Sequence, residues 1–192
     1  QGGNGMRMML SSMTGGGGSF YKNVKEKSYS VDKEFMGKEF LVKDALPQLE
    51  WKMESETKVV GGYTCYKATA VKPVDGSDFR NMRAKDETKK DDKKEEKEKS
   101  TNFMDGFEMP KEILITAWYT PEIPVNQGPE GYWGLPGLIL EVNDGKTIIL
   151  CSKVVMNAKE KAEIKATKVG KEVTQKEYDE IVTAKMKEMQ EM

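Results

Sequence analysis

Short segments rich in Val, Ile, Tyr, Phe and Thr, separated by turn residues, make up most of the chain after residue 19. Within them apolar and polar side chains often alternate, as where Ala68 and Ala70 flank Thr69, and this pattern is typical of a strand with one face more buried than the other. The pattern predicts strands at Phe20–Asn23, Ser28–Lys33, Glu39–Asp44, Leu49–Ser55, Tyr63–Val71, Leu114–Thr120, Leu138–Val142, Ile148–Val155 and Ala162–Lys168.

Helical periodicity is convincing only at the C-terminus. Thr174, followed three residues later by Glu177, forms a capping box, and five apolar residues then fall on one face: Tyr178, Ile181, Val182, Met186 and Met189. We expect this helix to dock on the open face of the sheet, although a partner-binding or membrane-surface helix is the alternative. Since no helical pattern lies between the strands, the fold class is mainly β: an antiparallel, curved sheet with a C-terminal amphipathic helix. A half-barrel of the lipoprotein-carrier type is one form of this fold.

The length of 192 residues indicates one β-rich domain, over residues 20–192, preceded by a flexible Gly/Met-rich arm at residues 1–19. Residues 75–110 interrupt the domain with a run of Asp, Glu and Lys that buries too little apolar area to offset its ordering entropy. We expect a solvated, disordered extension between two paired strands. An interaction loop or a calcium-attracting acidic patch is the functional alternative.

Charge and composition exclude several partners. The 31 Lys and Arg residues nearly balance the 32 Asp and Glu residues, and basic and aromatic residues form no common stripe, so a nucleic-acid surface is unsupported. No apolar run approaches the roughly 20 residues of a membrane-spanning helix. The first residue, Gln1, is not an initiator, so we expect a processed chain or a portion of a longer one.

The sequence contains no histidine, which removes the usual base for nucleophilic catalysis and the commonest neutral zinc ligand. We therefore assign no catalytic, cofactor-binding or metal-binding residue and expect a non-enzyme that needs no cofactor. Paired carboxylates keep a hydrolase as a third candidate, although no pair stands out. The second candidate is a Cu(I)-handling protein, because Met6, Met8, Met9 and Met13 bring soft thioethers to the arm.

Residues 131–141 read GYWGLPGLILE, an apolar run with three glycines and one proline. In Leu135–Leu138, Pro136 and Gly137 occupy the second and third positions of a four-residue turn, which is the pattern of a type II turn with positive φ at the glycine. The sequence therefore predicts a structural turn, with Gly134 at its start, that leads into a strand. Three aromatic residues around these segments are candidates for a binding surface: Trp118, Tyr132 and Trp133.

GLPGLI at residues 134–139 resembles the signature of the GLPGLI family, proteins of unknown function found mainly in Bacteroidetes. Three further blocks resemble the family in family order: FLVKDALPQLEWKM, ETKVVGGYTCYKATA and AWYTPEIPVNQGP. The resemblance extends from about Phe20 to the terminal helix. It departs from the family in two ways, because the usual signal peptide and early strands are missing and the charged run separates two strands that a short turn normally joins. We therefore expect a C-terminal portion of a family member.

The resemblance implies an exported β-sheet protein of the cell envelope, in the periplasm or associated with the outer membrane. Its expected role is an accessory binding protein for an apolar ligand or an envelope partner protein, with a TonB-dependent receptor as a candidate partner. The implied export also permits a disulfide between Cys65 and Cys151. The alternative is two separate buried thiols, because the sequence does not show that their strands are neighbours.

Overall fold

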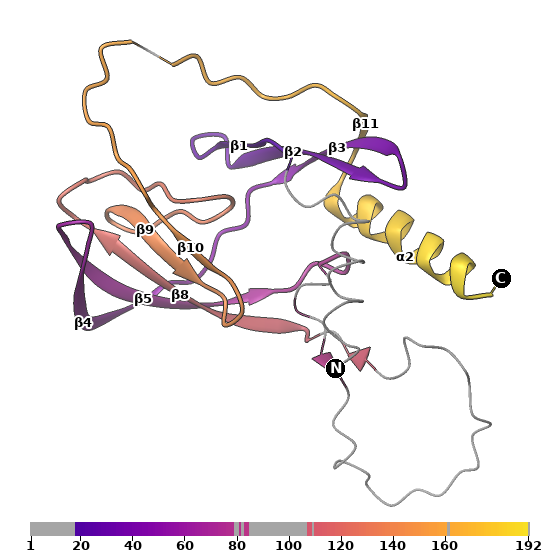
Figure 1. Ribbon diagram of the computed structural model, residues 1–192, viewed down its shortest axis with the longest axis horizontal. Helices are drawn as coiled ribbons and strands as arrows, with labels where there is room; N and C mark the ends of the chain where they lie inside the picture. The colour runs from indigo at the N-terminus through magenta and orange to yellow at the C-terminus, as the bar shows by residue number, and fades with distance from the viewer. Residues whose placement is uncertain are drawn as a thin grey trace, which may run out of the picture.

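The computed structural model describes residues 18–78, 81, 83–84, 107–108, 110–160 and 162–191 (Figure 1). Almost the whole predicted arm and most of the charged insertion lie outside these residues. The fold is mainly β with a C-terminal helix, which confirms the predicted class. The elements are β1 Phe20–Asn23, β2 Ser28–Phe35, β3 Lys38–Ala45, β4 Lys52–Val60, β5 Tyr63–Pro73, β6 Arg83–Ala84, β7 Phe107–Glu108, β8 Glu112–Thr120, β9 Leu138–Asn143, β10 Ile148–Leu150, β11 Lys171–Val173 and α2 Gln175–Glu191.

Four strands in the order β1-β2-β3-β11 form the first sheet, called sheet A here. The first three are antiparallel neighbours, whereas β11 runs parallel to β3. Helix α2 follows β11 directly and packs on one face of this sheet, where Phe40 and Val42 meet Tyr178 and Val182. Docking of the C-terminal helix on a sheet is therefore confirmed (Figure 1).

The predicted capping box starts α2. The Thr174 amide and hydroxyl both donate to the Glu177 carboxylate, at 2.7 and 3.1 Å, and the Glu177 amide donates back to the Thr174 hydroxyl at 3.2 Å. These bonds satisfy amides that the first turn of a helix leaves without intrahelical partners. None of the helices in the described part of the chain has the length and apolar character of a membrane-spanning segment.

Five strands in the order β10-β9-β8-β5-β4 form the second sheet, called sheet B, and all its neighbours are antiparallel. Its inner face carries the larger core, in which Ala68, Ile115 and Ala117 pack against Tyr132 and Leu135 from the loop before β9. Strands β5 and β8 pair from Tyr66 with Tyr119 to Pro73 with Glu112. Direct pairing of the strands on either side of the charged insertion is thus confirmed.

The strand predictions need correction near the C-terminus. Ala162–Lys168 is not a strand: the described residues there are irregular, and Ile164 is 79% exposed. The only apolar residues in KAEIKATK are Ala and Ile, and they bury too little area to stabilise an added edge strand. The strand lies later, at β11, where Val173 joins the core under α2. Instead of forming one antiparallel sheet, nine of the described strands divide between two open sheets, and β6 and β7 form a separate two-stranded sheet.

The first residues of the predicted insertion contact the terminal helix. The Asp179 carboxylate accepts hydrogen bonds from the Gly76 amide at 3.2 Å, the Ser77 hydroxyl at 2.5 Å and the Gln175 side-chain amide at 2.8 Å. Ser77 is buried, and burial raises the pKa of the neighbouring Asp75. The segment that leaves β5 is therefore fixed to α2 before the charged run begins.

Candidate functional site: the outer face of sheet B

Sheet B has one face without a full covering layer in the described part of the chain. Side chains alternate along its strands, so the residues next to the inner-face core positions point to the opposite side. Four large aliphatic side chains there are strongly exposed: Val71 at 55%, Leu114 at 61%, Ile148 at 62% and Leu150 at 58%. Val71 and Leu114 face each other across β5 and β8. We call these four residues, with the charged network described next, the outer face.

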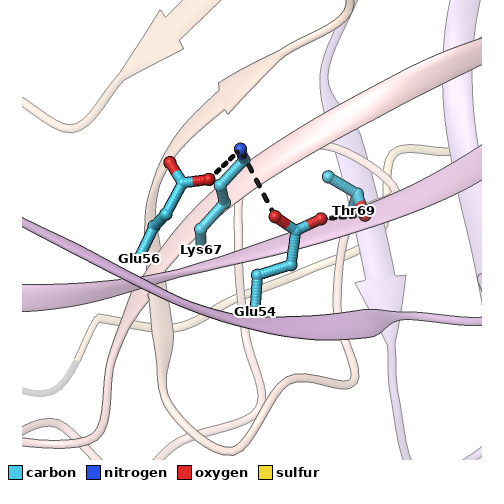
Figure 2. A network of polar contacts seen from close by, with 4 residues as sticks. All are labelled: Glu54, Glu56, Lys67 and Thr69. Carbon is cyan, nitrogen blue, oxygen red and sulfur yellow. Dashed lines mark hydrogen bonds and ion pairs between the residues drawn. The ribbon is translucent and has the colours of Figure 1, made fainter.

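A charged network occupies the outer face between β4 and β5 (Figure 2). The Lys67 ammonium lies 2.9 Å from the Glu56 carboxylate and 3.4 Å from that of Glu54, and the Thr69 hydroxyl donates to Glu54 at 3.0 Å. The Thr69 hydrogen bond, assisted by Lys67, lowers the pKa of Glu54, while the hydrogen bond to Glu56 raises the pKa of Lys67. These shifts favour the charged forms of Glu54 and Lys67, and Lys67 is the shared cation of the two carboxylates.

A second charged pair covers the aromatic residue of this face. Lys58 on β4 lies 2.6 Å from the Glu141 carboxylate on β9 and 4.4 Å from the centre of the Trp118 ring on β8. An ammonium over an indole face is an attractive cation–π contact. Trp118 thus lies on the outer face with its ring covered by a lysine, and its role in binding stays a prediction.

The carboxylates of this face are poorly suited to acid–base chemistry. A general acid at neutral pH needs a raised pKa, as in glycosidases, whereas the pKa of Glu54 is lowered and both Glu54 and Glu56 contact Lys67. Within the described residues no three His, Cys, Asp or Glu side chains come together as a metal site. The methionines of the arm, proposed as Cu(I) ligands, lie outside those residues.

A small cleft opens on the inner side of sheet B. Its volume of about 10 Å³ is room for about one water molecule, whereas small-molecule sites typically measure several hundred Å³. It is lined by Glu130, Tyr132, Val142, Asp144, Thr147 and Ile149. This cleft cannot enclose an apolar ligand.

Tyr132 and Trp133, the other two predicted surface aromatics, are buried, with exposures of 7% and 8%. The Trp133 indole donates to the Pro47 carbonyl at 2.8 Å, and the Trp51 indole donates to the Trp133 carbonyl at 2.8 Å. A buried indole needs such an acceptor. These aromatics therefore fix the loop before β9 to the segment before β4, and the prediction that they form a binding surface is corrected.

The predicted type II turn is wrong in its detail. Gly137 does not have a positive φ; the glycine in the left-handed region is Gly134, with φ of 95°. Gly137 is required for a different reason, because a Cβ atom there would lie 2.2 Å from the Thr120 carbonyl oxygen at the end of β8. The motif thus allows two backbones to touch where β9 begins, and that contact is long-range, so a local turn rule could not reveal it.

Both cysteines are free thiols, so the predicted disulfide is not formed. Cys65 lies in β5 and Cys151 follows β10, and β8 and β9 lie between these two strands. Both thiols instead belong to a small cluster on the outer side of sheet B, around Val60 and Leu140.

Sequence reasoning missed Lys22. Its ammonium donates to three carbonyl oxygens of the loop before β9: Gly128 at 2.5 Å, Glu130 at 2.8 Å and Tyr132 at 2.8 Å. Burial lowers the pKa of Lys22 to about 8, although the nearby Glu130 carboxylate acts to raise it. One side chain of β1 therefore ties sheet A to the loop that covers sheet B. No local signal distinguishes it from the other lysines.

Residues 51–141, just under half of the chain, match a family model described as a protein of unknown function (Porph_ging). The label refers to Porphyromonas gingivalis, which points to a Bacteroidetes family. No curated protein and no solved structure matches the chain. The matched stretch covers β4, β5, β8 and most of β9. The chain is thus similar, over the strands that build most of the outer face, to a family without an assigned function.

Proposed function

We propose that this chain is a non-catalytic, exported module of the cell envelope that binds a partner protein through the outer face of sheet B. The exposed aliphatic side chains of that face carry the proposal. Val71 on β5, Leu114 on β8, and Ile148 and Leu150 on β10 are each more than half exposed on one sheet, with β9 between β8 and β10. Exposed aliphatic side chains on a shared surface mark interaction sites more often than scattered ones do.

The charges of the outer face favour a protein partner over a small ligand. Lys67 contacts both Glu54 and Glu56, and Lys58 pairs with Glu141, so each charged group on this face has an oppositely charged neighbour, although the first network keeps a net charge of −1. A desolvated charge without a partner would oppose docking by several kcal/mol. A broad surface with apolar residues around paired charges is typical of a protein interface, whereas the cleft described above is too small for an apolar ligand.

Export and the envelope location rest on the resemblance of residues 134–139 and the three further blocks to the GLPGLI family. A family of that kind implies periplasmic or outer-membrane-associated proteins, and a TonB-dependent receptor is one candidate partner. The match of residues 51–141 to a family of unknown function supports a relationship to Bacteroidetes proteins.

Charged substitutions on the outer face test the proposal. Leu114→Lys and Ile148→Lys place a charge among the exposed aliphatic residues, whereas Ile164→Lys changes a residue that is 79% exposed and lies outside the strands of sheet B. Each variant is expressed in the native envelope and isolated after chemical cross-linking. We expect a partner that is retained by the wild-type chain and Ile164→Lys but lost from the other two. Equal recovery with all four chains would refute a role of this face.

A further inference from the structure

The chain between β10 and β11, residues 151–170, forms neither helix nor strand in its described residues. Both ends of this stretch are fixed to the fold, because the Cys151 amide donates to the Leu140 carbonyl at 2.7 Å and β11 pairs with β3. In the view of Figure 1 it leaves β10 and arches outside the strands of both sheets before it enters β11. We call residues 151–170 the connecting segment.

The connecting segment exposes most of its large apolar side chains to water. The exposed fractions are 61% at Val155, 55% at Met156, 79% at Ile164 and 51% at Val169. Since the segment has no regular secondary structure, these side chains do not line up on one face of a helix or strand, as they do in peptides that a protein groove binds. The interface of a bilayer accepts apolar side chains without a matched groove, because binding there scales with the apolar area that is buried.

Charge is unevenly divided between the connecting segment and the rest of the chain. The segment contains five lysines and two glutamates, a net charge of +3, whereas the whole chain carries −1, so the remaining residues carry −4. Its described lysines are all exposed: Lys153, Lys159, Lys165 and Lys168. Lys165 pairs with Glu163 at 3.0 Å, but both side chains stay more than 70% exposed. An anionic surface therefore attracts this segment and repels the rest of the chain.

We propose that the connecting segment binds the surface of an anionic phospholipid membrane, with its lysines at the lipid headgroups and its exposed apolar side chains in the interface. Lipid charge attracts basic residues near a membrane surface, and burial of neighbouring apolar side chains strengthens the contact. The bilayer covers side chains that the fold itself leaves in water. This contact is separate from the outer face of sheet B and does not depend on a protein partner.

An environment-sensitive dye on the segment tests the contact. In a Cys151→Ser background the remaining native thiol, Cys65, is fully buried, so the dye labels Ile164→Cys or the control Lys176→Cys, at an exposed position of α2. Each labelled chain is mixed with vesicles of phosphatidylglycerol and phosphatidylcholine. We expect a blue shift of the emission from position 164 only, and from neither position with vesicles of phosphatidylcholine alone. Equal shifts at both positions, or no shift at 164, would overturn the proposal.

Charge reversal tests the role of the lysines. Lys165→Glu with Lys168→Glu should lower the partition onto the phosphatidylglycerol vesicles about tenfold or more, whereas Lys176→Glu with Lys187→Glu, an equal change of net charge on α2, should lower it far less. Leu114→Lys, on the outer face, should bind vesicles like the wild-type chain, which distinguishes lipid binding from partner binding. Vesicle co-sedimentation measures the partition, and circular dichroism verifies that each variant is folded. Equal losses from both charge-reversed pairs would refute a specific role of the connecting segment.

Discussion

Gly137 lies where the start of β9 touches the end of β8, and its lack of a side chain permits the contact. A Cβ atom there would lie 2.2 Å from the Thr120 oxygen and 2.5 Å from the Thr120 carbon. At Gly134, by contrast, the nearest atom to an added Cβ lies 3.9 Å away, on Trp51, so only the positive φ opposes a side chain. The two glycines therefore serve different physical needs within one short motif.

We expect Gly137→Ala to destabilise the protein more than Gly134→Ala. The first variant forces two strands apart, at a cost of about 3 kcal/mol or more by comparison with overpacked cores. The second imposes only a strained φ, at about 1–2 kcal/mol. Pro136→Ala should cost about 1 kcal/mol or less, through the entropy of the unfolded chain. Urea denaturation of the three variants measures the order, and a larger loss at Gly134 would contradict the contact with Thr120.

Lys22 gives the stability of the protein a distinct pH dependence. Burial lowers its pKa to about 8 in the folded chain from the ordinary value of 10.5. Between these values the unfolded state binds more protons than the folded state, so the contribution of Lys22 to the free energy of unfolding rises with pH. We expect the free energy of unfolding of the wild-type chain to rise relative to that of Lys22→Met from about pH 8 to pH 10. Urea denaturation at several pH values provides the test, and a constant difference would contradict the burial of Lys22.

The two cysteines should titrate as separate thiols. Two free thiols are expected per chain in denaturant without reductant, because Cys65 in β5 and Cys151 after β10 are both free in the structure. In the native protein Cys151 should react first, since Cys65 is fully buried and burial raises the pKa of its thiol. Reaction with a disulfide reagent, followed by peptide mapping, measures both. The absence of free thiols would show that the chain forms the bond after all.

At the scale of elements, alternation of apolar and polar side chains correctly predicted strands where a neighbouring strand pairs with the segment. β1 lies at Phe20–Asn23 as predicted, and the capping box at Thr174 correctly marks the start of α2. The pattern failed at Ala162–Lys168, where small side chains alternate without a neighbouring strand. It also missed β11, whose three residues pair with β3 from more than 120 residues away, a relation that no local pattern contains.

The described ends of the charged insertion, which we expected to be a disordered extension, contain regular contacts. β6 and β7 pair through Arg83 with Glu108 and Ala84 with Phe107, and Ser77 bonds to Asp179. Replacement of residues 85–106 by Asn-Gly should close β6 and β7 as a two-residue hairpin and leave the melting temperature within a few degrees of the wild-type value. Removal of residues 76–84 as well should lower it further, by loss of the bonds to Asp179. A large loss from the shorter deletion would mean that residues 85–106 pack.

For the whole molecule, the sequence predicted a β-rich domain with a terminal helix but not how its layers meet. The separation into two sheets depends on contacts such as Lys22 with the carbonyls of residues 128–132 and Trp133 with Pro47, which join segments about 80 to 110 residues apart. The sequence also did not show which side chains of sheet B form the exposed outer face. Leu114 is followed by core residue Ile115 in the same strand, and only the arrangement of neighbouring strands reveals which of the two remains exposed.

Partner binding through the outer face is the central claim, and site-specific photo-cross-linking tests it most directly. A photoreactive amino acid replaces Leu114, or Ile164 as a control, in the chain expressed in its native envelope. Both positions are strongly exposed, but only Leu114 lies on the outer face. The account predicts one discrete cross-linked protein, distinct from a second copy of this chain, from position 114 and none from position 164. No product from position 114, or the same products from both positions, would contradict it.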